Sequence, residues 1–164
     1  AYVECGWGRL VWGNAFLYEY LDGFRNVEKF MQALVQRGAG KDTIAGFLER
    51  LADAVNGLTG AGAYHADLSG KNIFTRDGTQ FYFIDLDAVV LGGVYDDTRR
   101  LYNHVQLYDS FCDVLNDAML VPFITRMLTP EHDPRVWMPA VRKGQHQRRR
   151  RVEARWAREG KRKA

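Results

Sequence analysis

Four side chains that end in a carboxylate or an amide interrupt a part of the sequence that otherwise resembles buried strand. "YHADLSGKNIF" contains Asp67 and Asn72, and "FYFIDLDAV" contains Asp85 and Asp87. Carboxylate and amide oxygens are hard ligands that suit Mg²⁺, with the phosphates of a substrate completing its coordination shell. These residues therefore predict phosphoryl-transfer chemistry, provided that the fold brings them together.

A β-hairpin is the element that should position them. The pair Asp77-Gly78 is a hairpin-turn signal between "NIFT" and "QFYFIDL", which are rich in aromatic and β-branched residues. A hairpin returns the end of its second strand to the start of its first, so Asn72 and Asp85 should be neighbours, with Asp67 on the adjoining loop. Any one of these residues could equally cap a turn, but all three at these spacings favour a site.

The remaining sequence alternates between short strands and amphipathic helices. The order is hairpin, helix, helix, hairpin, helix and tail, with only small antiparallel sheets, which indicates an α+β fold. The expected elements outside the central hairpin are strands at 9–12 and 15–20 with a turn at 13–14, a helix at 26–36 capped by Asn26, a helix at 42–58 capped by Asp42, and a helix at 97–127.

Bulk composition describes an ordinary globular domain. Of the 164 residues 46% are hydrophobic, yet no apolar run reaches the roughly 18–20 residues that span a bilayer. No signal peptide is recognisable at the start. The two cysteines, Cys5 and Cys112, are too few for a disulfide framework and lack metal-ligand spacing. These features favour a reducing, cytoplasmic compartment.

Charge is distributed unevenly along the chain. Residues 142–164 contain 11 basic and 2 acidic side chains, whereas residues 1–141 contain 12 basic and 18 acidic ones. An acidic body with a basic tail could bind an anionic membrane surface, where Trp156 would also be suited to the interface. Nucleic-acid binding through phosphates is the less favoured alternative. A solvated, partly disordered tail is the third interpretation.

The motifs resemble a known fold. "HADLSGKN" is similar to the catalytic loop of protein-kinase-like proteins, His-x-Asp-Leu-x-x-x-x-Asn, and "IDLD" falls where that fold has its magnesium-binding Asp-Phe-Gly. Upstream, "FLYEYLDG" resembles the hinge between the two lobes. Taken together, "HADL…N…FIDLDAV" and the Arg-containing helix that follows look most like the lipopolysaccharide kinase family, whose members phosphorylate a sugar of the lipid A inner core.

The resemblance implies roles for individual residues. Asp67 would accept or orient the proton of the acceptor hydroxyl, while Asn72 and Asp85 would hold Mg²⁺ against the phosphates of ATP. Further implied roles are adenine contacts by the backbone of Glu19 and Leu21, a cofactor contact by Lys71, a second metal or substrate contact by Asp87, and bracing of the loop rather than chemistry by His65.

Departures from protein kinases are also visible. Ser69 stands where most protein kinases have a lysine, and Lys71, two places later, either replaces that charge or is an ordinary surface lysine. Leu86 and Asp87 replace Phe and Gly, and no Ala-Pro-Glu segment follows. These losses argue against a kinase of Ser, Thr or Tyr in proteins. Aminoglycoside or choline kinases, and a non-catalytic pseudokinase module, are the alternatives to a lipopolysaccharide kinase.

The resemblance also divides the chain. Residues 1–21 would be the end of a small lobe and the hinge, residues 22–141 a kinase-like large lobe, and residues 142–164 the basic tail. The Gly-rich loop, strand lysine and helix glutamate of the small lobe normally precede the hinge, but only about 18 residues precede Glu19 here. The small lobe is therefore expected to be largely absent and the chain to have little activity alone. The expected acceptor is a lipid-linked sugar or another small molecule.

Overall fold

A computed structural model describes residues 2–7, 10–16, 21–158 and 160 of the chain, with side chains from residue 21 onward. The first described element is an antiparallel hairpin of β1 (Tyr2–Trp7) and β2 (Leu10–Phe16). The expected hairpin with a turn at Gly13-Asn14 is wrong, because these two residues pair with Cys5 and Glu4 inside the ladder. The expected strand residues 17–20 lie outside the described residues.

Two amphipathic helices form the first half of the core. The helix α1 (Val27–Gln36) begins at Asn26, whose side chain accepts from the amide of Lys29, as predicted. The helix α2 (Lys41–Gly60) is capped by Gly40, so the prediction that Asp42 caps it is wrong and Asp42 lies in the first turn. The predicted apolar stripe of α2 is buried throughout: Ile44, Phe47, Leu48, Leu51, Ala52 and Val55.

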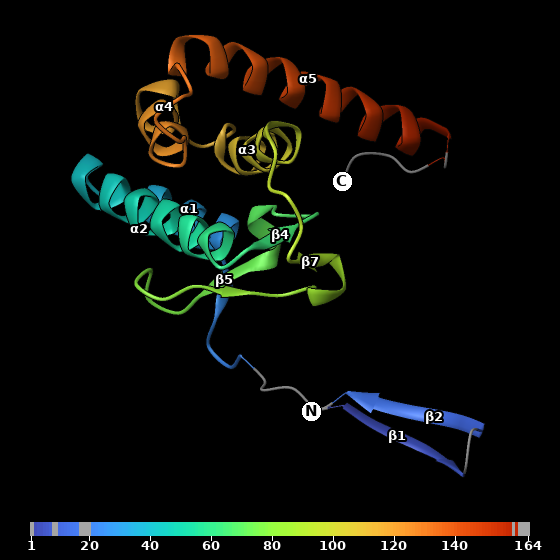
Figure 1. Cartoon of the computed structure of the whole chain (residues 1–164). Helices are drawn as coiled ribbons and strands as arrows, with labels where there is room; N and C mark the ends of the chain where they lie inside the picture. The colour runs from blue at the N-terminus through green and yellow to red at the C-terminus, as the bar shows by residue number, and fades with distance from the viewer. Residues whose placement is uncertain (1, 8–9, 17–20, 159, 161–164) are drawn as a thin grey trace.

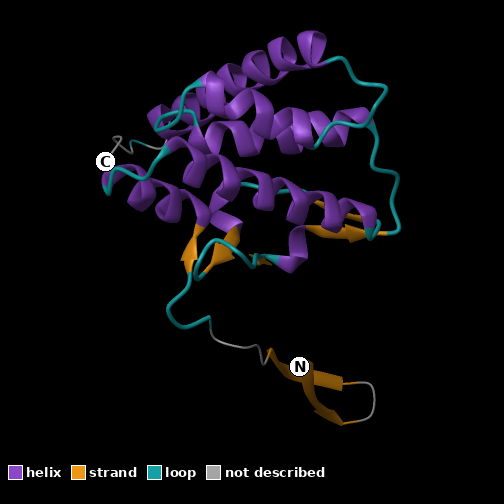
Figure 2. Ribbon diagram, turned by 90° about the vertical axis from the view of Figure 1, so that its left-hand side faces the viewer, coloured by secondary structure: helices purple, strands orange, loops and turns teal. Residues whose placement is uncertain are grey.

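Two small antiparallel sheets lie on one side of the helices (Figures 1 and 2). One has the order β3 (Arg25–Asn26), β5 (Ile73–Thr75), β6 (Tyr82–Phe83), so the predicted hairpin around Asp77-Gly78 is confirmed. The other pairs β4 (Ala63–His65) with β7 (Val89–Leu91). Between them lie two short 3₁₀ turns, η1 (Gly70–Asn72) and η2 (Leu86–Ala88).

The predicted helix at 97–127 is in fact two helices, α3 (Asp97–Phe111) and α4 (Asp117–Arg126). The chain turns because the amides of Val114 and Leu115 both bond to the carbonyl of Phe111, and Asn116 begins a new helix. The Tyr108 hydroxyl donates to the Asp117 carboxylate at 2.7 Å, which holds α4 against α3. No proline or glycine marks this break, so spacing alone did not reveal it.

The last described element is α5 (Pro134–Arg158), which lies across α3 (Figure 1). Its buried residues Met138 and Val141 belong to the same hydrophobic core as α1 to α4. The boundary expected between residues 141 and 142 falls inside this helix, which continues without interruption. In the part of the chain that the structure describes, five helices and small antiparallel sheets make an α+β fold that is consistent with part of a kinase-like fold.

Candidate functional site

The loop that carries Asp67 is the centre of the candidate site. This Asp67 loop (residues 66–72) connects β4 to β5 and includes η1. The Nδ2 atom of Asn72 donates to the Asp67 carbonyl at 2.9 Å and to the Asp67 carboxylate at 3.1 Å. Both bonds use the amide nitrogen, so they do not occupy the amide oxygen of Asn72. The structure thus places the predicted acid and the predicted amide in direct contact.

Asp85 reaches the same site from the returning strand. The amide of Ile84 donates to the carbonyl of Asn72 at 2.9 Å, which places Asp85 beside Asn72 as the hairpin argument expected. Asp85 has φ 62° and ψ 55°, and it is the single non-glycine with positive φ among the described residues. This left-handed backbone is sparsely populated outside glycine and concentrates at functional sites. It turns the chain sharply from β6 into η2.

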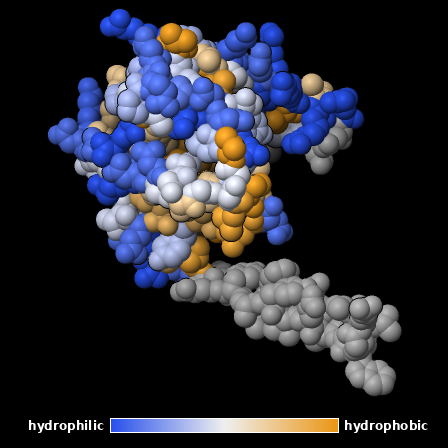
Figure 3. Space-filling model, in the orientation of Figure 1, coloured by the Kyte–Doolittle hydropathy of each residue, from blue (hydrophilic) through white to orange (hydrophobic). Residues whose placement is uncertain are grey.

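The segment after Asp85 is exposed and forms the rim of the candidate site. Asp85 and Asp87 are both exposed, and so are the apolar side chains of Leu86 (71%), Leu91 (76%) and Val94 (77%). Figure 3 shows apolar atoms gathered on this part of the surface, near β7. Among the described residues, no hydrogen bond joins the Asp87 side chain to Asp67 or Asn72, whose side chains bond to each other.

His65 braces the loop. Its ring is fully buried, Nδ1 accepts from the amide of Asp67 at 3.1 Å, and Nε2 lies 2.8 Å from the carbonyl of Ile84. Because Nδ1 accepts and a carbonyl can only accept, the ring proton must be on Nε2, where it donates to Ile84. His65 therefore links the Asp67 loop to Ile84, the residue before Asp85.

Two buried polar residues of α3 support the loop and were missed in the sequence. Gln106 donates from Nε2 to the Asp67 carboxylate at 3.2 Å and to the carbonyl of Ala66 at 3.1 Å, while its oxygen accepts from the amide of Leu68 at 3.0 Å. Asn103 donates to the carbonyl of His65 at 2.8 Å. Both side chains are 1% exposed. The available signal was two amides, three residues apart, on the apolar face of a helix.

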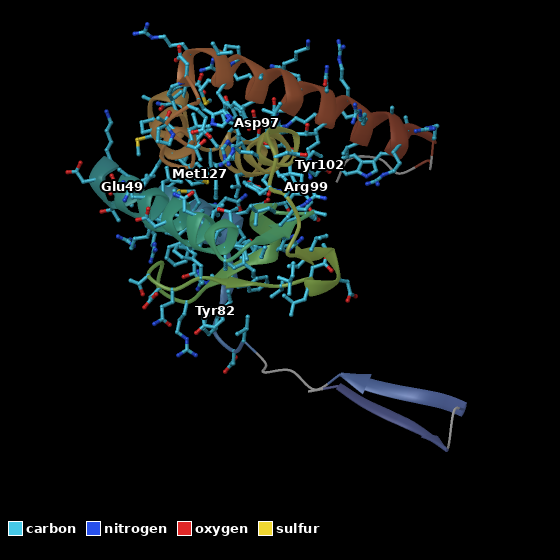
Figure 4. All side chains as sticks on the ribbon, in the orientation of Figure 1. Glu49, Tyr82, Asp97, Arg99, Tyr102 and Met127 are labelled. Atoms are coloured by element: carbon cyan, nitrogen blue, oxygen red, sulfur yellow. The ribbon has the colours of Figure 1, made fainter. Side chains whose placement is uncertain are left out.

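Two cation–π contacts lie at the start of α3, and one of them reaches β4. The guanidinium of Arg99 lies 4.9 Å from the ring centroid of Tyr64, and that of Arg100 lies 4.9 Å from the ring centroid of Tyr95 (Figure 4 labels Arg99). Such cation–π contacts are worth roughly 0.5–2 kcal/mol each. The Arg99–Tyr64 contact fixes the first turn of α3 at the strand from which the Asp67 loop departs, whereas the Arg100–Tyr95 contact joins α3 to the segment just before it.

The remaining predicted residues lie around the loop. Lys71 is exposed and its charge acts on the carboxyl of Glu28. Burial raises the pKa of Glu28, although the hydrogen bond from Ser110 and the charge of Lys71 act to lower it. Leu21 is half-buried at the start of the described body, where its carbonyl accepts from the amide of Phe24 at 3.3 Å. Glu19 lies outside the described residues.

Oxygen ligands at the site are few. The described residues contain no group of three or more His, Cys, Asp or Glu side chains that could hold a metal ion. The predicted magnesium ligands are a smaller set, the amide of Asn72 and the carboxylate of Asp85. In the described part of the chain, no helix has the length and apolar character needed to cross a membrane.

An acid placed by an amide on a loop between two strands, with a second acid where the hairpin returns, is the arrangement used by phosphotransferases of the kinase type. The profile of the lipopolysaccharide kinase (Kdo/WaaP) family matches residues 2–115. The chain belongs to this family, which confirms the resemblance seen in the motifs and implies a phosphotransferase that uses ATP. A comparison with curated proteins finds no match.

Proposed function

We propose that this protein is an ATP-dependent kinase that transfers the γ-phosphate to a hydroxyl of a sugar of the lipopolysaccharide inner core. The observation that carries the proposal is the Asp67 carboxylate, positioned by Asn72 on one side and by Gln106 on the other. Family membership favours this acceptor over those of aminoglycoside or choline kinases.

Asp67 would act on the acceptor. Its carboxylate accepts or orients the hydroxyl proton while the acceptor oxygen forms a bond to the γ-phosphorus and the bond from that phosphorus to the leaving diphosphate breaks. Asn72 and Gln106 hold the carboxylate by donating to different oxygens, Oδ2 and Oδ1. Positioning is the main contribution required of the protein, because phosphoryl transfer needs little covalent assistance.

The site residues fit a magnesium ion. The oxygen of Asn72 is not used in the bonds to Asp67, and the exposed carboxylate of Asp85 is presented by a strained backbone conformation. Both are hard oxygen donors, and Asp87 could add a third. When bound, Mg²⁺ would neutralise charge on the phosphates. The backbone of Glu19 and Leu21 remains our proposal for adenine, and Lys71 for a phosphate or substrate contact.

Because the proposed acceptor sugar is attached to a lipid, the protein would act at a membrane surface. The face of α5 opposite its buried residues Met138 and Val141 carries Lys143, Arg150, Arg151 and Arg158, which we name the outer stripe. All four are exposed, and none forms an ion pair with the described residues. We propose that the outer stripe binds an anionic membrane surface, which would place the enzyme at the cytoplasmic face of the inner membrane; nucleic acid is the less favoured partner.

The test of the proposed reaction is the substitution Asp67→Ala in this protein. Transfer of labelled phosphate from ATP to an acceptor that carries Kdo should fall by about 10²–10⁴-fold, the usual contribution of a positioned acid or base. Asp77→Ala removes an exposed carboxylate from the β5–β6 turn and should leave transfer unchanged. Full activity of the Asp67 variant would contradict the role of Asp67.

A further inference from the structure

A cleft opens beside the Asp67 loop and is closed by the end of α5. Its volume is about 400 Å³, within the range of roughly 300–1,000 Å³ that is typical of small-molecule sites. Ser69 and Lys71 of the Asp67 loop form one wall, α1 and α3 contribute a second, and α5 contributes the third. The family profile ends at residue 115, so the α5 wall belongs to a part of this chain that the profile does not cover.

Two of the arginines in this α1–α5 cleft are structural. Arg148 and Arg149 each lie 2.6 Å from the carboxylate of Asp109, and Arg149 also bonds to Asp113 at 2.8 Å. The side chain of Asp109 is only 10% exposed, so these pairs hold α5 on α3. Their charges are already compensated within the protein, so a ligand would be bound by the other cationic side chains of the cleft.

The remaining lining has the chemistry of a sugar site. Lys71 and Arg155 are exposed and form no ion pair with the described residues, so they can donate to an acidic group. Glu28 and Ser69 can accept from hydroxyl groups. Trp156, half-buried on α5, offers an aromatic surface with an N–H donor against which the apolar face of a sugar ring can pack.

We propose that the α1–α5 cleft binds the acceptor, an acidic polyhydroxylated sugar, and that Arg155 and Trp156 of α5 are its binding residues. This inference rests on the proposed kinase function and names where its acceptor lies. The ligand would enter next to Asp67 because Ser69 and Lys71 belong both to the cleft and to the Asp67 loop. Binding of the acceptor would therefore depend on α5, a helix outside the motif region.

Binding can be measured without turnover. The probe is free Kdo, an eight-carbon acidic sugar, titrated into the protein without ATP and followed by saturation-transfer NMR and by tryptophan fluorescence. Arg155→Ala and Trp156→Ala should each raise the dissociation constant at least tenfold. Arg135→Ala is the control, because Arg135 is exposed near the start of the same helix and does not line the cleft. Circular dichroism should show equal helix content in all three variants.

The outcomes separate the two proposals. Binding that weakens in Arg155→Ala and Trp156→Ala but not in Arg135→Ala supports the cleft, even if the protein transfers no phosphate and the kinase proposal fails. Equal binding by all variants overturns the cleft assignment, and so does the lack of Kdo binding by the wild-type protein up to millimolar concentration. Phosphate transfer that is unaffected by both cleft variants also overturns it while leaving the kinase proposal intact.

Discussion

Gly70 allows the Asp67 loop to approach α1 and α3 closely. A Cβ atom at this position would lie 2.7 Å from Cγ of Glu28, 3.1 Å from Cβ of Ser110 and 3.2 Å from its hydroxyl. The same hydroxyl accepts from the Gly70 amide at 2.8 Å, so the loop cannot retreat without losing that bond. Gly70→Ala should lower the free energy of unfolding by about 1–3 kcal/mol, as overpacking does. Urea unfolding measures the change.

Gly57 provides the matched control for Gly70. It lies inside α2, where nothing lies within 4 Å of the added Cβ. Gly57→Ala should therefore stabilise the protein by about 0.5–1 kcal/mol, because alanine loses less backbone entropy in a helix. Equal effects of the two substitutions would show that the crowding at Gly70 has no energetic consequence.

At the scale of elements, α5 is attached to α3 through Asp109. Burial acts to raise the pKa of this carboxyl, but bonds from Arg149 and Gln145 and the charge of Arg148 outweigh it, so the pKa is lowered. A lowered folded-state pKa means stability that is present above the ordinary carboxyl pKa of about 3.9 and is lost as the pH falls through the folded value. Acid below about pH 4 should therefore loosen α5.

Asp109→Asn tests this attachment. It should cost about 1.5–3 kcal/mol at neutral pH, the worth of a charged hydrogen bond, and should reduce the dependence of stability on pH below about pH 4. Chemical unfolding between pH 7 and pH 3 measures both. Asp53→Asn removes a carboxylate bonded to Arg126 on the exposed surface, where an ion pair contributes little, and should change stability much less. A larger effect of Asp53→Asn would contradict the role given to Asp109.

The outer stripe of α5 predicts membrane binding that depends on charge. Each cation near an anionic surface contributes about 1 kcal/mol, so replacing Arg150, Arg151 and Arg158 by Ala should weaken binding to phosphatidylserine vesicles by roughly 100-fold. Sedimentation with vesicles at several salt concentrations measures it. A control variant replaces Lys29, Arg37 and Lys41, which are exposed on other elements, and has the same net charge.

The vesicle experiment also discriminates between partners. Equal loss of binding in the control variant would mean that net charge, not the outer stripe, governs binding. Tighter binding of a short nucleic acid duplex than of vesicles at the same salt concentration would favour the nucleic-acid alternative. Binding to neither would leave the outer stripe a solvated surface and contradict the membrane proposal.

At the scale of the whole molecule, the helices share one core. Met138 and Val141 of α5 are buried in the same cluster as Leu107 and Phe111 of α3. A chain truncated before Pro134 should therefore expose apolar surface on α3, lose cooperative thermal unfolding and bind a hydrophobic dye. A chain that ends at Arg158 keeps all of α5 and should unfold like the full chain. Cooperative unfolding of the shorter truncation would show that α5 is a separate appendage.

Local patterns in the sequence were sufficient for much of this protein. Several correct predictions depend on residues close in the chain, where helix and hairpin geometry determines which side chains come into contact. They are the cap at Asn26, the apolar stripe of α2, the turn at Asp77-Gly78 and the spacing of Asp67 and Asn72. The same local motifs identified the family.

Contacts between distant segments were decided only by the tertiary structure. Gln106 reaches Asp67 across 39 residues, and Arg149 reaches Asp109 across 40, so no period or spacing could reveal either contact. The break between α3 and α4 and the joining of the basic segment to the core likewise follow from packing of surfaces that are remote in sequence. The sequence by itself determined the candidate site residues, because their types and spacing are local, and the tertiary structure decided what holds them and which helix closes the cleft beside them.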